Sequence, residues 1–223
     1  WKYLLGIIKI GLPAGLQSMV FSLSNVVIQA AINSFGSDGI AGSTAEQNFE
    51  FMAYFVINAF AQTATTFTSQ NFAAQDKERC KKIYRLCTLI GLASCLGLSL
   101  IFLIGRHLLI QIFSTDENVI HYAMIRMWSV CLLELLTGVY EISGGCLRGM
   151  GHSMTPAVIT VLGTCVFRLV WVNTIYAGQR QMCIRDRVYP VSWVITGTAV
   201  TVAYFIIRRK EFAQIGKRRA DII

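Results

Sequence analysis

Four glutamates lie inside stretches of sequence that are otherwise apolar enough to cross a membrane. They are Glu46, Glu50, Glu134 and Glu141. A carboxylate in the hydrocarbon core of a bilayer is costly unless it is paired, protonated or turned toward water. Such residues can hold a proton, a metal cation or an organic cation. We therefore interpret the four glutamates as a sign that the chain moves something across the membrane.

Glu46 and Glu50 belong to the most polar of the apolar stretches. They are four residues apart, so they share one helix face about a turn from each other. The same stretch is rich in amides and hydroxyls, which suit a helix that lines an aqueous cavity. We expect Glu50 and Asn48 to face such a cavity. The alternative is that the hydroxyls bond to their own backbone and the glutamates reach the outer interface, as we expect of Glu46.

Glu134 and Glu141 are seven residues apart, which puts them on one helix face two turns from each other. A short turn over about residues 149–156 should make the next helix run back antiparallel. An equal count of residues on either side of this turn puts Arg168 level with Thr137. We predict that Arg168 pairs with Glu134 or Glu141. The alternative is an ion pair that is structural and has no part in transport.

The composition indicates an integral membrane protein. Of 223 residues, 54% are hydrophobic and only 14% are charged, whereas a soluble domain carries about 25% charge. A membrane-spanning helix needs about 20 mainly apolar residues. We predict an all-α membrane protein with six such helices. They run over about residues 4–33, 41–73, 83–104, 119–150, 156–176 and 188–207.

The positive charges alternate from one side of the predicted membrane to the other. The net charge is +8, and the basic residues gather before the first span, in 77–85, near Arg148 and in a tail over 208–223. Because cytoplasmic loops carry the excess of Lys and Arg, both ends of the chain should be cytoplasmic. This pattern explains the charge without a nucleic-acid partner, for which no motif is present.

One basic stretch contradicts that rule. Residues 178–187 would place Arg180, Arg185 and Arg187 on the outer side. The stretch also resembles translated sequencing-adapter read-through. We interpret it as an artefact or an irregular outer loop and assign it no function.

The sequence offers no set of residues that suits an enzyme. No metal-binding, phosphate-binding or hydrolase motif is found. The seven cysteines contain no CxxC pair, so we interpret them as small apolar packing residues. We predict a protein that is not an enzyme and binds no metal or cofactor, apart from a coupling ion.

Three short motifs in order resemble the multidrug and toxic compound extrusion (MATE) family. They are Gly11-Leu-Pro13 at the start of a span, Ser69-Gln-Asn71 at the end of the next, and Leu147-Arg-Gly-Met-Gly151 followed by Ser153-Met-Thr-Pro156. The resemblance covers nearly the whole chain except 178–187. It implies twelve helices in two six-helix lobes around a cavity, of which this chain is the C-terminal lobe. The other lobe would precede Trp1.

The resemblance also implies a function. The family exports cationic and amphiphilic drugs in exchange for H⁺ or Na⁺, here across the plasma membrane of a prokaryote. Some members carry an acidic residue where this chain has Phe21, and an Asp where it has Thr137. Since those acids are missing, we assign the coupling ion or the substrate charge to Glu50, Glu134 and Glu141.

The remaining candidate residues are polar or structural. We expect Gln17, Asn25, Asn48 and Thr137 to line the cavity. We expect Pro13, Gln70, Asn71, Arg148 and Gly149 to organise helix bends and ends. Gly145 and Gly149 form a GxxxG spacing, which favours close helix packing.

Two other functions stay open. A flippase for lipid-linked sugars, from the same superfamily, would line its cavity with several Arg and Lys to hold a pyrophosphate. Away from the cytoplasmic ends of the predicted spans, the basic residues are only Arg168 and, near the outer end, Arg126. A membrane scaffold subunit that transports nothing would not need the polar residues of the second span.

Overall fold

The computed structural model describes residues 2–33, 36–131, 133–176 and 187–220. Within these ranges the chain is helical apart from short turns, and no strand occurs. The prediction of an all-α membrane protein is confirmed. Nearly all of the basic stretch at 178–187 lies outside the described residues.

Six helical segments follow one another in the described part of the chain. The first three are the continuous helices α1 (Lys2–Asn33), α2 (Gly36–Ala73) and α3 (Lys77–Gln111). The fourth joins α4 (Glu117–Arg126), the π-helical turn η1 (Met127–Cys131) and α5 (Leu135–Gly149). The fifth joins α6 (Met154–Thr160), η2 (Val161–Val166), α7 (Phe167–Trp171) and η3 (Val172–Tyr176). The sixth is α9 (Val188–Ala220).

Several helices run beyond the apolar spans that the sequence predicts. α3 begins at Lys77, six residues before the predicted span, and α9 continues through the basic tail to Ala220. Hydropathy marks the part of a helix that fits the hydrocarbon, whereas the hydrogen-bonded helix can continue into water. Within the described residues, four segments are long and apolar enough to cross a membrane, namely Leu4–Ala30, Lys77–Gln111, Met154–Ile175 and Val188–Ile215. The segments outside this group, α2 and α4–α5, carry the four glutamates.

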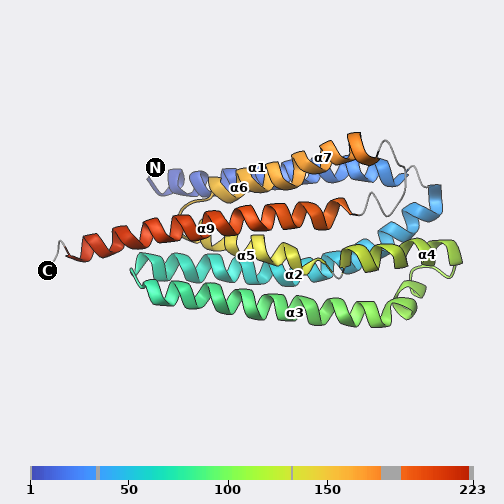
Figure 1. Cartoon of the computed structure of the whole chain (residues 1–223), viewed down its shortest axis with the longest axis horizontal. Coiled ribbons are helices and arrows are strands. Elements are labelled where there is room, and N and C mark those ends of the chain that lie inside the picture. The colour runs from blue at the N-terminus through green and yellow to red at the C-terminus, as the bar shows by residue number, and fades with distance from the viewer. Residues whose placement is uncertain (1, 34–35, 132, 177–186, 221–223) are drawn as a thin grey trace.

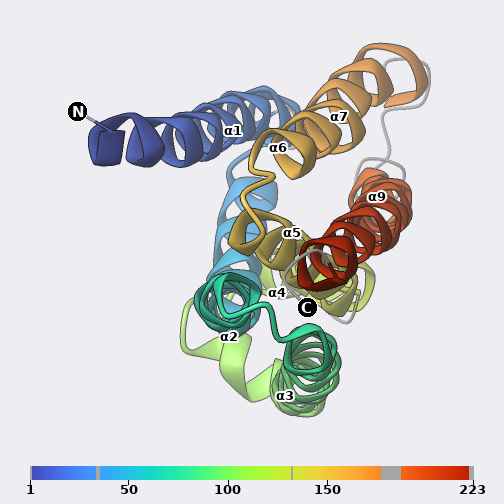
Figure 2. The same ribbon diagram turned by 90° about the vertical axis from the view of Figure 1, so that its left-hand side faces the viewer.

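The helices lie roughly along one axis, with α2 and α5 side by side at the centre (Figures 1 and 2). α3 and α4 pack against α2, and α9 packs against α5. α1 and the α6–α7 segment lie together on the other side of the bundle (Figure 2). The more apolar segments thereby cover part of the surface of α2 and α5.

Glycines let α5 approach α2 closely, as the GxxxG spacing predicts. A Cβ atom on Gly145 would lie 2.5 Å from the carbonyl oxygen of Ala61, and one on Gly149 would lie 2.6 Å from that of Thr65. These distances are shorter than van der Waals contact and involve backbone atoms, which cannot move aside. Only glycine fits at these two positions.

The end of α5 is a Schellman motif that fixes the turn into α6. The N–H of His152 donates to the carbonyl of Leu147, and the N–H of Gly151 donates to that of Arg148, each at 2.9 Å. Gly151 has a φ of +89°, which glycine adopts without strain. This turn sets the direction in which α6 follows α5.

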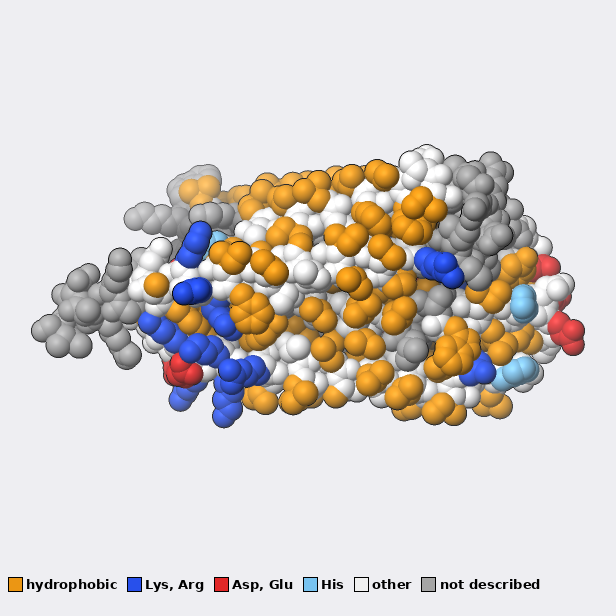
Figure 3. Space-filling model, in the orientation of Figure 1, with side chains coloured by type: hydrophobic (Ala, Val, Ile, Leu, Met, Phe, Trp, Pro, Cys, Tyr) orange, Lys and Arg blue, Asp and Glu red, His pale blue; other side chains and the backbone are white. Residues whose placement is uncertain are grey.

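The surface separates apolar and charged regions (Figure 3). Hydrophobic side chains cover the long face of the molecule, as a surface toward lipid requires. Lys and Arg gather at the end where α2 turns into α3 and where α9 leaves the bundle. Among the described side chains, Cys80, Cys87, Cys95, Cys146 and Cys165 are buried thiols without disulfides.

Candidate functional site

A cleft of about 600 Å³ lies between α1, α2 and α5, with further wall from α6, α7 and α9. Five charged residues line it, namely Glu50, Glu134, Glu141, Arg148 and Arg168. Aromatic rings of Phe21, Tyr54 and Trp193 supply apolar surface beside them. Membrane transporters keep ionisable groups on such water-accessible surfaces rather than toward lipid.

The uncharged polar wall agrees with the sequence prediction at three positions. Gln17 and Asn25 line the cleft from α1, and Thr137 lines it from α5. Asn48 does not line it: the side chain is exposed, and its amide donates to the carbonyl of Thr44 at 2.8 Å. Two residues along a helix turn a side chain by about 200°, so Asn48 points away from the side that Glu50 occupies. The prediction for Asn48 was wrong.

Part of the polarity of α2 is bound within the helix itself. The hydroxyls of Thr63 and Thr65 donate to the carbonyls four residues earlier, at 2.8 and 2.9 Å. The alternative reading of these hydroxyls is therefore correct at both positions. Thr65 nevertheless lines the cleft, together with the amides Asn58 and Gln62.

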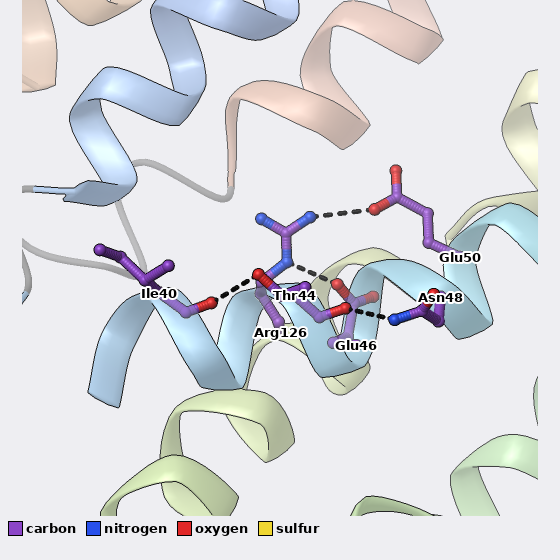
Figure 4. Close-up of polar contacts among 6 residues, drawn as sticks. All are labelled: Ile40, Thr44, Glu46, Asn48, Glu50 and Arg126. Atoms are coloured by element: carbon purple, nitrogen blue, oxygen red, sulfur yellow. Dashed lines mark hydrogen bonds and ion pairs between the residues drawn. The ribbon is translucent and has the colours of Figure 1, made fainter. Parts of the chain in front are cut away.

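Arg126 of α4 binds both glutamates of α2 (Figure 4). Its Nε donates to Oε2 of Glu46 at 2.5 Å, and its Nη2 donates to Oε2 of Glu50 at 2.9 Å. Arg126 and Glu46 are fully buried, whereas the Glu50 side chain is 13% exposed. The expectation that Glu46 reaches the outer interface was wrong, because the guanidinium compensates its charge within the protein.

The sequence contains one indication of this contact, which is the depth of each residue along its own helix. α2 and α4 begin at the same end of the molecule (Figure 1). Glu46 lies ten residues after the start of α2, and Arg126 lies nine residues after the start of α4. At 1.5 Å per residue the two side chains have nearly the same depth. A comparison of depths across all spans would therefore have put Glu46 level with Arg126, although it would not have shown that they pair.

Arg168 does not form the predicted ion pair. Its Nε donates to Oγ of Ser192 at 3.2 Å, and its guanidinium carbon lies 4.5 Å from the ring centroid of Tyr189. Among the ion pairs of the described residues, none joins Arg168 to Glu134 or Glu141. The prediction assumed a regular α-helix, but the π-helical turn η2 precedes Arg168 and changes the direction of the side chain.

The two glutamates of the fourth segment find other neighbours. Oε1 of Glu134 accepts a hydrogen bond from Oγ1 of Thr137 at 3.0 Å. Glu141 faces Arg148, with 3.9 Å between Oε2 and Nη1. Arg148 also donates to Oε1 of Gln17 at 3.3 Å, so it connects α5 to α1. Arg148 thus lines the cleft in addition to the role at the helix end that we predicted.

The predicted motif residues occupy helix ends and bends. Pro13 is buried inside α1. The carbonyls of Gln70 and Asn71 accept the N–H groups of Ala74 and Asp76 at the end of α2, at 3.1 and 2.9 Å. Gly11, which belongs to the first of these motifs, is not a site of close packing among the described residues. A Cβ there would meet nothing within 4 Å, and Gly11 lines the cleft.

The sequence model of the MatE family matches residues 13–172, more than half of the chain. The chain belongs to the MatE family. This is a family of multidrug efflux transporters, so the prediction that the protein is not an enzyme is confirmed. The described residues contain no group of three or more His, Cys, Asp or Glu that could hold a metal ion.

MatE relatives are similar over part of their own length. The probable multidrug resistance protein NorM of Thermotoga maritima is 21% identical over 76% of this chain and 36% of its own. The multidrug export protein MepA of Staphylococcus aureus is 24% identical over 70% of this chain and 34% of its own. The matched region is about a third of these relatives.

The fold is that of solved MatE-family transporters. The Vibrio cholerae MATE transporter VcmN in its bent form superposes with a TM-score of 0.83 at 19% identity. The match covers 94% of this chain and 48% of that one. The chain therefore spans about half of a solved transporter of this fold.

Proposed function

We propose that this chain forms one lobe of a secondary transporter that exports cationic or amphiphilic compounds in exchange for H⁺ or Na⁺. The observation that carries the proposal is the cleft with three carboxylates, those of Glu50, Glu134 and Glu141. Two guanidinium groups, of Arg148 and Arg168, share its wall. The cleft therefore has more acidic than basic groups, which favours a cation.

The cleft also offers the two kinds of surface that an amphiphilic cation needs. Its carboxylates attract the positive charge, and its aromatic rings bury the apolar part of the compound. A coupling ion that binds the same carboxylates excludes the compound, so exchange follows from competition. A second six-helix lobe would supply the opposite wall and the rocking motion of alternating access.

We further propose that the basic end of the molecule is cytoplasmic, with both chain ends on that side of a prokaryotic plasma membrane. Lys and Arg gather at one end of the bundle (Figure 3). The excess of Lys and Arg in cytoplasmic segments supports this orientation.

A flippase for lipid-linked sugars is the second candidate. Two arginines line the cleft, as a flippase requires, but they are Arg148 and Arg168 rather than Arg126 and Arg168. Three carboxylates in the same wall would repel a pyrophosphate, which favours the export of cations. A scaffold subunit without transport would have no use for a polar cleft inside the membrane.

The test uses cells that express the protein from its whole reading frame. These cells should accumulate less ethidium than cells without the protein. Each of Glu50→Gln, Glu134→Gln and Glu141→Gln should raise ethidium accumulation toward the level of the empty cells. Glu78→Gln is the matched control, because Glu78 is exposed and lies outside the cleft. Unchanged export by all three cleft variants would refute the assignment.

A further inference from the structure

In the cluster of Glu46, Glu50 and Arg126, the positively charged guanidinium of Arg126 binds Glu50 at the wall of the cleft. We propose that Arg126 competes with cationic cargo for Glu50 and thereby lowers the affinity of the cleft for cations. This inference rests on the proposed function. It makes Arg126 a residue that sets cation affinity, whereas Glu46 holds Arg126 in position.

The two carboxylates of the cluster differ in their access to the cleft. Glu46 is fully buried between α2 and α4. The helices meet closely here, since a Cβ on Gly42 would lie 2.6 Å from the carbonyl oxygen of Val119. Glu50 is partly exposed and lines the cleft, but Glu46 does not. Of the two glutamates in this cluster, only Glu50 can be reached by a cation in the cleft.

The guanidinium binds the two carboxylates through different nitrogens. Nε donates to Glu46 and Nη2 donates to Glu50. Arg126 can lose the second bond and keep the first, because its remaining contact satisfies the buried charge of Glu46. A cation that takes Glu50 therefore does not leave an unpaired charge in the interior, which would be costly.

Two neighbours of Arg126 allow this exchange. Its guanidinium carbon lies 5.4 Å from the ring centroid of Tyr189, which also lines the cleft. The face of the Tyr189 ring can stabilise the Arg126 guanidinium after another cation has displaced it from Glu50. In addition, η1 begins at Met127, directly after Arg126. Such π-helical turns interrupt the regular helix and are frequent at functional sites.

The test compares variants in which the charge of the cluster is controlled. The wild-type cluster has two carboxylates and one guanidinium, a net charge of −1. The double variant E46Q/R126Q also has a net charge of −1, but Glu50 is now free of Arg126. The triple variant E46Q/E50Q/R126Q is neutral. A gain in the double variant that the triple variant lacks thus reports on release of Glu50 and not on net charge.

Binding of tetraphenylphosphonium is measured by equilibrium dialysis on the protein purified from its whole reading frame. We expect the double variant to bind about tenfold more tightly than wild type, a difference typical of one partly buried charge pair. The triple variant should lose this gain. R126K is a second variant that keeps every charge but replaces the fork with a single ammonium, which cannot reproduce its two-pronged geometry. It should also bind more tightly than wild type.

The outcomes separate this proposal from the proposed function. Wild-type affinity in both the double variant and R126K would overturn the role of Arg126 and leave cation export intact. If the double variant does not fold, R126K alone decides in the same way. Absence of binding in the wild type and in every variant would overturn both proposals.

Discussion

The four glutamates differ in their polar neighbours, and the neighbour determines how free each carboxylate is to accept a cation. Glu46 and Glu50 already bind Arg126, and Glu141 faces Arg148. Glu134 has no ion-pair partner among the described residues and binds the hydroxyl of Thr137 instead. Its second oxygen has no hydrogen-bond partner in that part of the chain. Of the four, Glu134 is the carboxylate best prepared to receive a cation.

We predict that Glu134→Gln weakens cation binding without harm to the fold. The amide oxygen of glutamine can still accept from Thr137, and no buried charge remains to be compensated. Tetraphenylphosphonium affinity should fall by about tenfold or more, the effect of one lost charge contact. The unfolding temperature should stay the same or rise. Full retention of binding would show that Glu134 does not touch the cation, and Glu78→Gln provides the baseline.

Arg168 gains its stability from a ring and a hydroxyl rather than from a carboxylate. Its guanidinium carbon lies 4.5 Å from the Tyr189 ring and 5.4 Å from the Phe21 ring. A desolvated cation over an aromatic face contributes about 2 kcal/mol. Phe21 occupies a position that is acidic in some members of the family, so here a ring replaces a charge beside Arg168.

We predict that Tyr189→Leu lowers the free energy of unfolding by about 2 kcal/mol, whereas Tyr189→Phe changes it by less than about 1 kcal/mol. The phenylalanine ring keeps the face on which Arg168 lies, and leucine does not. The measurement is reversible unfolding in detergent micelles. A double-mutant cycle with Arg168→Gln should give a coupling of about 1 kcal/mol or more. Equal loss in the leucine and phenylalanine variants would contradict the stacked arrangement.

At the scale of elements, α2 and α5 form the contact around which the other helices are placed. Part of the polarity of α2 faces the cleft, as at Glu50, Asn58 and Gln62, and part is satisfied by the helix backbone, as at Thr44 and Thr63. The contact between α2 and α5 depends on Gly145 and Gly149, where no side chain separates the two backbones. Packing of small residues provides the main attraction between helices in a bilayer, where apolar burial adds little.

We predict that Gly145→Ala destabilises the protein by about 1–3 kcal/mol, the range for overpacked sites. The added methyl would lie against the carbonyl of Ala61 in the facing helix. Gly97→Ala is the matched control, because a Cβ at Gly97 meets nothing within 4 Å. That change should be neutral or stabilising, since alanine favours the helix by up to about 1 kcal/mol. Thermal unfolding in one detergent compares the two variants, and equal effects would exclude close α2–α5 contact.

At the scale of the whole molecule, charge separates the two ends of the bundle. The basic end contains the turn between α2 and α3, and the other end contains the turn between α3 and α4 (Figures 1 and 3). A cleft that lies between these ends fits a transporter whose single site is reached from each side in turn. The chain spans about half of the solved transporter VcmN.

We predict opposite labelling of the two ends in intact cells. In a background without reactive cysteines, Thr115→Cys should react with a membrane-impermeant maleimide from outside. Glu78→Cys should react only after the cells are permeabilised. Both positions are exposed, so a difference in reaction reports on the side of the membrane. The reverse result would place the basic end outside and contradict the proposed orientation.

The amino-acid sequence is enough to show that the protein lies in a membrane, where its helices run and to which family it belongs. Apolar runs interrupted by charged turns specify membrane helices, because a bilayer leaves the backbone no other way to satisfy its hydrogen bonds. The GxxxG spacing also predicted close helix packing at the end of α5, although it did not indicate which helix is the partner. The sequence put Arg168 level with Thr137, between Glu134 and Glu141, since depth follows from the rise along a regular helix, and all four residues line the cleft.

The tertiary structure alone decided which charges meet. Pairing depends on the rotation and packing of separate helices, and neither is written in the spacing along one of them. A π-helical turn directs Arg168 to Tyr189 and Ser192 instead of a glutamate. The close approach of α4 gives Arg126 both carboxylates of α2. A contact between two helices is a property of their interface, and this is the physical reason that depth was predictable and partnership was not.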